Sequence, residues 1–150
     1  MRVLLVSANR EHIPDPIFPL GLAYVAAATR QADHEVAVAD LCFGRRPLDT
    51  LRHTIRSFRP DAIGLSLRNV DNAAWPRTTD YLDWHRQVLA TVRHSCEAPV
   101  ILGGSGFSIL PEAYLQALHA DFGLVGEGEE TFPRLLEALA HDERRRHTIR

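Results

Sequence analysis

The sequence predicts a single α/β domain built on a doubly wound, parallel β-sheet. Three observations lead to this prediction. Short apolar runs of strand length recur along the 150 residues, and segments with helical spacing separate them. Glycine and proline mark many of the junctions between the two kinds of segment. Strands that alternate with helices in this way form a parallel sheet with helices on its faces.

The first part of the chain predicts two strands and the helix between them. Residues 3–7 (V-L-L-V-S) are almost continuously apolar, which is typical of a central parallel strand. A long loop over residues 8–18 follows, and ordered loops of this length usually carry function. Pro19 suits the first position of a helix, so a helix is expected over residues 20–30. Residues 34–40 alternate in polarity and predict the next strand, at an edge of the sheet.

The middle of the chain continues the alternation. Apolar residues at positions 48, 51, 55 and 58 have helical spacing and predict a helix over residues 48–58. Residues 62–67 (A-I-G-L-S-L) predict the third strand, and residues 81–94 predict the next helix. Residues 99–102 predict the fourth strand, which ends in a glycine-rich turn.

The last part of the chain completes the sheet. Residues 111–118 predict a short helix, residues 122–125 the fifth strand, and residues 130–140 the last helix. The expected strand order is 2-1-3-4-5, as in flavodoxin-like and other Rossmann-like folds. Residues 1–140 are expected to form one domain. Residues 141–150 (H-D-E-R-R-R-H-T-I-R) are expected to be a polar linker or tail that leads to a domain absent from this chain.

The composition excludes several classes of function. The formal net charge is −2, so the composition does not show the excess of positive charge that is typical of proteins that bind nucleic acid or an anionic membrane surface. All 17 basic residues are arginine, which excludes Schiff-base chemistry and any site that needs a lysine. Cys42 and Cys96 are far apart, which predicts a reducing, cytoplasmic setting. The apolar run over residues 20–28 is too short to span a bilayer.

Three ligand sites that are common in this fold do not match the sequence. A phospho-receiver domain needs acidic residues after the first strand, an aspartate after the third and a lysine after the fifth, and these are missing. A flavodoxin needs a hydroxyl-rich phosphate loop where residues 8–12 read A-N-R-E-H. A dinucleotide site needs G-x-G-x-x-G directly after the first strand, whereas the glycine-rich turn here follows the fourth.

Small residues follow the third, fourth and fifth strands. They are Ser66-Leu67, Gly103-Gly104-Ser105-Gly106 and Gly126-Glu127-Gly128. Any one of these segments also suits an ordinary tight turn between a strand and a helix. In the expected strand order, however, all three lie along one edge of the sheet, where ligands of open α/β sheets bind. Together they predict a groove that admits a large ligand.

Four segments carry a resemblance to a known family. They are residues 19–24 (P-L-G-L-A-Y), 61–69 (D-A-I-G-L-S-L-R-N), 102–108 (L-G-G-S-G-F-S) and 125–129 (V-G-E-G-E). In this order they resemble the N-terminal cobalamin-binding domain of B12-dependent radical S-adenosylmethionine enzymes, and the resemblance covers the chain up to about residue 139.

The resemblance implies a corrinoid whose nucleotide tail enters the crevice of the sheet and whose ring lies over residues 67–69 and 105–108. Gly103 and Gly104 are expected to clear space for the tail, and Ser66 to hydrogen-bond its buried polar atoms. The implied cofactor-binding residues are Ser66, Leu67, Arg68, Asn69, Gly103, Gly104, Ser105, Gly106, Phe107, Gly126, Glu127 and Gly128. Arg68 and Asn69 are expected to face the lower side of the cobalt, although a surface ion pair is the other interpretation of Arg68.

Two departures from related families matter. The D-x-H-x-x-G motif, whose histidine ligates cobalt from below in B12 domains of the mutase type, is absent. We therefore expect a base-off corrinoid without a histidine ligand, with His12 as the weak candidate for cobalt and a solvated loop as its other interpretation. The chain also lacks C-x-x-x-C-x-x-C, so a [4Fe-4S] cluster and S-adenosylmethionine are expected only in a radical domain downstream, in cis or in trans.

The sequence thus predicts a cobalamin-binding module of a radical S-adenosylmethionine methyltransferase or related enzyme, with no catalytic residue in this chain. Two alternatives stay open. One is a degenerate B12-type domain that acts as a protein-interaction scaffold, and the other is a small-ligand-binding flavodoxin-like domain. The histidines other than His12 are scattered and expected at surface or boundary positions, and Trp75 is expected in a packing or interdomain role. Glu127, Glu129 and Glu130 suit a helix N-terminus better than acid–base work.

Overall fold

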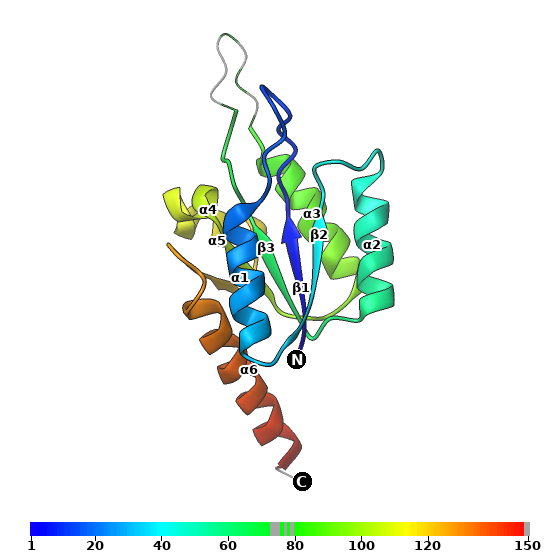
Figure 1. Cartoon of the computed structure of the whole chain (residues 1–150), viewed down its shortest axis with the longest axis vertical. Helices are drawn as coiled ribbons and strands as arrows, with labels where there is room; N and C mark the ends of the chain where they lie inside the picture. The colour runs from blue at the N-terminus through cyan, green and yellow to red at the C-terminus, as the bar shows by residue number, and fades with distance from the viewer. Residues whose placement is uncertain (73–75, 77, 79, 149–150) are drawn as a thin grey trace.

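The computed structural model describes residues 1–72, 76, 78 and 80–148, and Trp75 lies outside them. Five strands in this part of the chain form one parallel sheet in the order β2-β1-β3-β4-β5, which confirms the predicted fold and strand order (Figure 1). β2 is an edge strand, as its alternating pattern predicted. The strands are β1 (Arg2–Ser7), β2 (Glu35–Asp40), β3 (Ala62–Ser66), β4 (Val100–Gly103) and β5 (Phe122–Gly123).

Helices cover both faces of the sheet. α1 and α6 pack on one face with a buried cluster that includes Leu22 and Leu136, and α2, α3 and α5 pack on the other with a cluster that includes Leu51 and Val88. The helices are α1 (Leu20–Gln31), α2 (Pro47–Phe58), α3 (Leu82–Ser95), α4 (Ser105–Ile109), α5 (Pro111–Leu118) and α6 (Thr131–Thr148). Figure 1 shows α1 in front of the strands, and α6 below α1 at the lower left.

The apolar runs of the sequence follow from this two-sided burial. Leu5 of β1 contributes to the cluster beneath α1 and α6, whereas its neighbours Leu4 and Val6 contribute to the cluster on the opposite face. Successive side chains of a strand point to opposite faces, so a strand covered on both sides needs an apolar residue at nearly every position. The same alternation decides which side chains can reach a ligand held against one face.

Three details differ from the sequence-based expectations. α4 was not predicted, because five residues after a glycine turn are too few to show a helical period. β5 pairs over two residues only, rather than the four expected. α6 continues to Thr148 instead of ending near residue 140, because the glutamates and arginines of this segment are good helix formers. The domain boundary at residue 140 stays a prediction.

His85 on α3 is buried, although a surface or boundary position was expected. Only 3% of the residue is exposed, and the ring centroid of Tyr114 lies 5.8 Å away. The ring atom Nδ1 has no hydrogen-bond partner among the described residues. Burial therefore disfavours the charged imidazolium and lowers the pKa of His85 from 6.5 to about 4.

This pKa predicts a loss of stability in acid. Between pH 6.5 and about 4 the unfolded chain binds a proton at His85 that the folded chain does not bind. The contribution of the buried, neutral His85 to the free energy of unfolding should therefore be fully present above pH 6.5. The free energy of unfolding should then fall by about 3 kcal/mol as the pH drops from 6.5 to about 4. Urea titrations at pH 7.5, 5.5 and 4.5 measure the change.

The variant His85→Leu should lose this component of the pH dependence, while the exposed His53→Leu on α2 should keep it. Equal pH profiles for the parent chain and His85→Leu would contradict the prediction.

Candidate functional site

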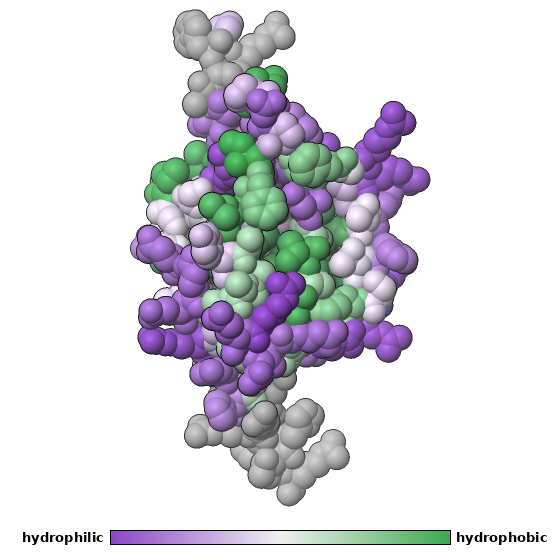
Figure 2. All heavy atoms as spheres, viewed as in Figure 1, coloured by the Kyte–Doolittle hydropathy of each residue, from purple (hydrophilic) through white to green (hydrophobic). Residues whose placement is uncertain are grey.

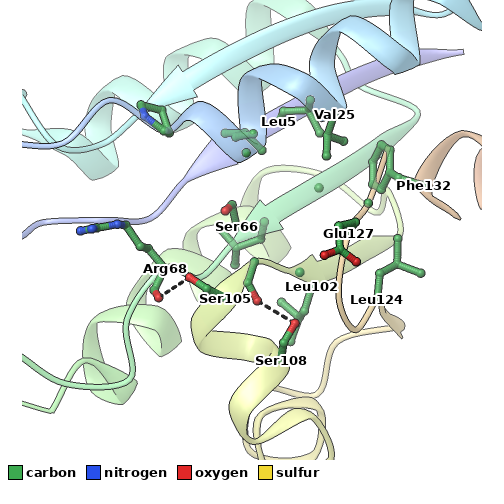
Figure 3. Close-up of a pocket in the computed structure, with 18 of the residues that line it drawn as sticks. Leu5, Val25, Ser66, Arg68, Leu102, Ser105, Ser108, Leu124, Glu127 and Phe132 are labelled. Carbon is green, nitrogen blue, oxygen red and sulfur yellow. Dashed lines mark hydrogen bonds between the residues drawn. The ribbon is translucent and has the colours of Figure 1, made fainter. Parts of the chain in front are cut away.

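A cavity of about 630 Å³ opens at the carboxyl ends of β3 and β4. Its walls come from the sheet, from α1, from the loop before α1 and from the segment between β5 and α6. Figure 3 shows Leu5, Val25 and Phe132 at one end of this cavity and Arg68 and Ser105 at the other. A volume of this size is typical of sites for cofactors and other small molecules.

The register of the strands gives the cavity a floor. Leu5, Gly64 and Ile101 are paired neighbours across β1, β3 and β4, and all three line the cavity. Two residues further along the strands, Ser66 and Gly103 form the next row on the same face. The inner row is therefore apolar, and the first polar side chain appears only in the outer row.

Gly64 lets two side chains close the inner end of the cavity. A Cβ atom at this position would lie 2.6 Å from Cδ2 of Leu5 and 3.0 Å from the ring of Phe132. Phe132, in the first turn of α6, is only 4% exposed. The absence of a side chain at Gly64 thus allows the Phe132 ring to lie directly on the sheet.

Gly103 and Gly104 have different roles. A Cβ at Gly103 would meet only the carbonyl oxygen of Leu124, at 3.8 Å, so this glycine leaves open space in the cavity. A Cβ at Gly104 would lie 2.7 Å from the carbonyl oxygen of Leu67, and Gly104 has a φ of +95° that other residues rarely adopt. The bare backbone of Gly104 therefore makes room for the end of β3, while its contribution to clearing space for a ligand stays a prediction.

Hydrogen bonds connect this turn to the neighbouring segments. The Ser105 hydroxyl donates to the carbonyl of Arg68 at 2.9 Å, and the Ser108 hydroxyl donates to the carbonyl of Gly104 at 3.1 Å (Figure 3). Oγ of Ser108 also accepts a hydrogen bond from the backbone N–H of Gly126, at 3.0 Å. The segments that follow β3, β4 and β5 are thereby joined into one rim.

Polar side chains with unused hydrogen-bonding capacity lie on this rim. Ser66, Arg68, Glu127 and Glu129 line the cavity, and none of their side chains has a hydrogen bond or ion pair with another described residue. The surface ion pair considered for Arg68 is therefore not formed within the described chain. The rim presents one cation, two carboxylates and a hydroxyl to whatever the cavity holds.

Most of the site residues expected from the sequence lie around the cavity. Leu67 and Phe107 do not line it, because their side chains are buried in the core on the opposite face. Gly106 packs against the backbone of Arg68, and Asn69 is also absent from the lining. The residues that do line the cavity are Ser66, Arg68, Gly103, Gly104, Ser105, Gly126, Glu127 and Gly128.

Several lining residues were missed by the sequence-based analysis of the site. They are mainly apolar and come from the loop before α1, from α1 itself, and from the segment around β5 and α6. These residues include Ile17, Phe18, Leu20, Val25, Leu124 and Phe132. The exposure of Ile17 (46%) and Phe18 (67%) distinguishes them from core residues, but a sequence does not reveal exposure. In Figure 2, green apolar surface extends along the middle of the face that α1 covers.

His12 lies away from the cavity lining. Its Nδ1 is 2.8 Å from the carbonyl oxygen of Arg10, and its Nε2 is 3.8 Å from Sγ of Cys42 in the segment after β2. The His12 ring is also edge-on to Phe43, with centroids 6.4 Å apart. These contacts hold the exposed imidazole on the β2 side of β1, whereas the cavity lies on the β3 side.

Side chains of the long loop after β1 anchor it in this position. The Arg10 guanidinium donates to the carbonyl of Leu41 at 2.8 Å and lies 5.5 Å from the ring centroid of Trp84. The Tyr81 hydroxyl donates to the Glu11 carboxylate, which lowers the pKa of Glu11. Burial, together with this carboxylate, raises the pKa of Tyr81 to about 12. At neutral pH the Tyr81 hydroxyl is therefore protonated and the Glu11 carboxylate is ionised, which are the states that this hydrogen bond requires.

Among residues 1–72, 76, 78 and 80–148, no group of three or more histidine, cysteine or acidic side chains is placed to hold a metal ion. Within the same residues, no helix combines the length and the apolar character needed to cross a bilayer.

The fold and the cavity define a ligand-binding α/β domain, and comparison with known proteins identifies its family. The family model described as "B12 binding domain" matches residues 6–136, so the chain belongs to the B12-binding domain family.

Curated relatives are whole methyltransferases. The chain is 33% identical over 142 residues to tryptophan 2-C-methyltransferase of Streptomyces laurentii, an alignment that covers 92% of this chain and 23% of that protein. It is 26% identical to cytidylyl-2-hydroxyethylphosphonate methyltransferase of Streptomyces wedmorensis, over 92% of this chain and 28% of the relative. The chain thus spans about a quarter of the length of these relatives.

Solved structures agree with this assignment. The radical S-adenosylmethionine methyltransferase TsrM of Kitasatospora setae superposes with a TM-score of 0.87 and 32% identity, over 94% of this chain and 26% of TsrM. Another structure of TsrM, which holds cobalamin and a [4Fe-4S] cluster, superposes with a TM-score of 0.85. The cobalamin-dependent radical enzyme OxsB has a TM-score of 0.74 at 19% identity over 93% of this chain and 19% of OxsB, which shows a shared fold.

The open space at Gly103 predicts a specific effect of a side chain there. Gly103→Val would place its methyl groups in the cavity, so cobalamin should bind at least tenfold more weakly, a loss of about 1.4 kcal/mol or more. Spectroscopic titration with hydroxocobalamin measures the effect.

Gly44→Val is the matched control. Gly44 does not line the cavity, and a Cβ there would meet its nearest neighbour at an ordinary 3.6 Å. Gly104→Val is a poor test because its side chain would collide with backbone. Undiminished binding by a folded Gly103→Val would contradict the prediction.

Proposed function

We propose that this domain holds cobalamin for a radical S-adenosylmethionine methyltransferase or related enzyme, with the nucleotide tail of the cofactor in the cavity and its ring over the rim. The observation that carries the proposal is the cavity itself, which is apolar inside and polar at the ends of β3 and β4. Its volume suits a nucleotide-sized group, and the open space at Gly103 lies where such a group would enter.

The apolar mouth supports the placement of the ring. Ile17, Phe18 and Leu20 line the cavity and are 46%, 67% and 58% exposed, respectively. Large apolar side chains grouped at the mouth of a cavity favour a site that a ligand or partner covers. A corrin ring resting there would remove this surface from water, and its amide side chains would meet the polar rim.

The proposal includes a base-off cofactor without a histidine ligand. His12 supports it, because the imidazole is engaged beside Cys42 and is not part of the cavity lining. Arg68 supports it as well, because its unpaired guanidinium lies at the rim (Figure 3). In this arrangement Arg68 would present a positive charge and hydrogen-bond donors to the lower side of the cofactor, and Asn69, next in the sequence though outside the cavity lining, would stand beside it.

The reaction itself requires residues beyond this chain. Cobalamin supplies a cobalt centre that can carry a methyl group, whereas the protein supplies binding and orientation. Cys42 and Cys96 are the only cysteines here, too few for the three-cysteine motif of a radical S-adenosylmethionine cluster. The partner of this domain is therefore a radical domain, in cis or in trans, that holds the [4Fe-4S] cluster and S-adenosylmethionine.

A binding experiment tests the core of the proposal. The 150-residue chain is mixed with hydroxocobalamin, desalted, and examined by visible spectroscopy and circular dichroism. We expect retained corrinoid with a base-off spectrum. A folded but colourless protein would overturn the proposal in favour of a scaffold or another small-ligand domain, and a base-on or histidine-ligated spectrum would overturn the base-off arrangement.

Arg68 offers a second test. A positive charge near the cobalt favours its more reduced state. Arg68→Gln should therefore shift the Co(II)/Co(I) midpoint potential to a more negative value. Arg68→Lys, which keeps the charge, should have a midpoint potential closer to that of the parent chain. Spectroelectrochemistry of the loaded domain measures the potential. Arg134→Gln is the control, because Arg134 lies on α6 outside the cavity lining and pairs with Glu130. Identical potentials for the parent chain and Arg68→Gln would contradict the proposed position of Arg68.

A further inference from the structure

We infer that a second cavity, lined by three arginines, binds the phosphate group of an organic phosphate monoester. This cavity is separate from the one at the ends of β3 and β4, because the two share no lining residue. The inference goes beyond the proposed function, since it concerns other residues and another ligand.

The second cavity, which we call the arginine cavity, has a volume of about 420 Å³ and lies where α2 begins, on the β2 side of the sheet (Figure 1). Its walls come from the start of α2, from the loop after β1 and from α3. The lining residues are Arg10, Arg46, Pro47, Leu48, Asp49, Arg52 and Trp84. Three guanidinium groups and one carboxylate give this cavity a formal charge of +2, in a chain whose net charge is −2.

The ion pairs of the arginine cavity show this surplus of positive charge. Arg46 and Arg52 both pair with Asp49, at N–O distances of 2.6 and 2.5 Å. The other ion pairs found among the described residues each join one arginine to one acid. Arg10 has no ion pair with a described residue. One carboxylate therefore leaves two guanidinium charges without compensation.

The position of these charges is unfavourable while no anion is bound. α2 begins at Pro47, and Arg46 lies directly before it. The N-terminus of a helix carries a partial positive charge, which repels a cation and attracts an anion. Residues that oppose a local rule in this way are expected at functional sites. An anion in the arginine cavity would be attracted by the arginines and by the helix end together.

Arg10 keeps hydrogen-bond donors free for such an anion. A guanidinium group has five N–H donors. Arg10 uses Nη1 for the carbonyls of Leu41 and Gly44, and its Nε and Nη2 donate to no described residue. The guanidinium also lies over the ring of Trp84, 5.5 Å from the centroid. These contacts fix its position in advance, so little conformational freedom is lost when it binds a ligand.

A phosphate monoester matches the charge of the arginine cavity. It carries a charge of about −1.5 to −2 near neutral pH and three strong acceptor oxygens. Guanidinium groups bind such oxygens through paired, charge-assisted hydrogen bonds. A carboxylate carries a single negative charge and would leave part of the surplus uncompensated.

The apolar side of the arginine cavity indicates that the phosphate is attached to an organic group. Pro47, Leu48 and Trp84 line it beside the arginines, and all three residues are partly exposed. An apolar group next to the phosphate would cover this surface, and the removal of apolar surface from water strengthens binding. Inorganic phosphate lacks this contribution.

Three probes test the inference on the 150-residue chain: phenyl phosphate, inorganic phosphate and benzoate. Calorimetric titration at pH 7.5 and low ionic strength measures their affinities, because salt screens the attraction. We expect phenyl phosphate to bind at least fivefold more tightly than inorganic phosphate and at least tenfold more tightly than benzoate. Hydroxocobalamin bound beforehand should leave these affinities unchanged.

Two substitutions should shift the affinity for phenyl phosphate in opposite directions. Arg52→Gln removes one guanidinium and should weaken binding at least fivefold. Asp49→Asn removes the competing carboxylate and should strengthen binding at least threefold, which the loss of a merely structural residue would not do. Arg56→Gln is the matched control, because Arg56 lies one turn further along α2 and outside the cavity lining. Circular dichroism shows that each variant is folded.

The possible outcomes are distinct. The inference would be overturned if the folded chain showed no saturable binding of phenyl phosphate, or if Arg52→Gln bound it as tightly as the parent chain. Benzoate that binds as tightly as phenyl phosphate would overturn the choice of phosphate, and inorganic phosphate that does so would overturn the organic group. Competition between phenyl phosphate and hydroxocobalamin would contradict a separate site. Failure of hydroxocobalamin alone to bind would overturn the proposed function and leave this inference intact.

Discussion

The site depends on the close approach between the end of β3 and the turn that follows β4. Leu67 donates its backbone N–H to the carbonyl of Gly103 at 2.8 Å, and its own carbonyl accepts from the N–H of Gly106 at 2.9 Å. A side chain at Gly104 or Gly106 would collide with this backbone. Because the two strand ends are held together in this way, they form a continuous floor, and Gly103 stays free to face the cavity.

The division of the cavity into an apolar interior and a polar rim follows from the strand register. Leu5, Gly64 and Ile101 form one row of the sheet, and Ser66 and Gly103 form the next. A ligand that fits both rows must itself be amphipathic, with an apolar part that goes inward and polar groups that stay at the edge. This requirement narrows the range of ligands more than the fold does, because the same fold holds many kinds of ligand.

Much of the fold could be predicted because nearly every strand position is buried on one face or the other, as Leu4 and Leu5 illustrate. The edge of the sheet that carries the cavity could be predicted from the small residues at the strand ends. The separate roles of Gly103 and Gly104 could not be predicted, because they depend on the φ of Gly104 and on contacts with residues that are distant in the sequence. The burial of His85 was missed for a similar reason, since Tyr114 packs against it from another helix.

The walls of the cavity come from opposite ends of the chain, because α1 follows the first strand and α6 follows the last. A molecule lodged between Val25 and Phe132 would act as a non-covalent crosslink between these two helices. Binding to the folded state alone stabilises a protein, by about 2.7 kcal/mol when the free ligand is at one hundred times its dissociation constant. Loading of this domain would therefore be a late step of its folding, and resistance to proteolysis would report how much of it is loaded.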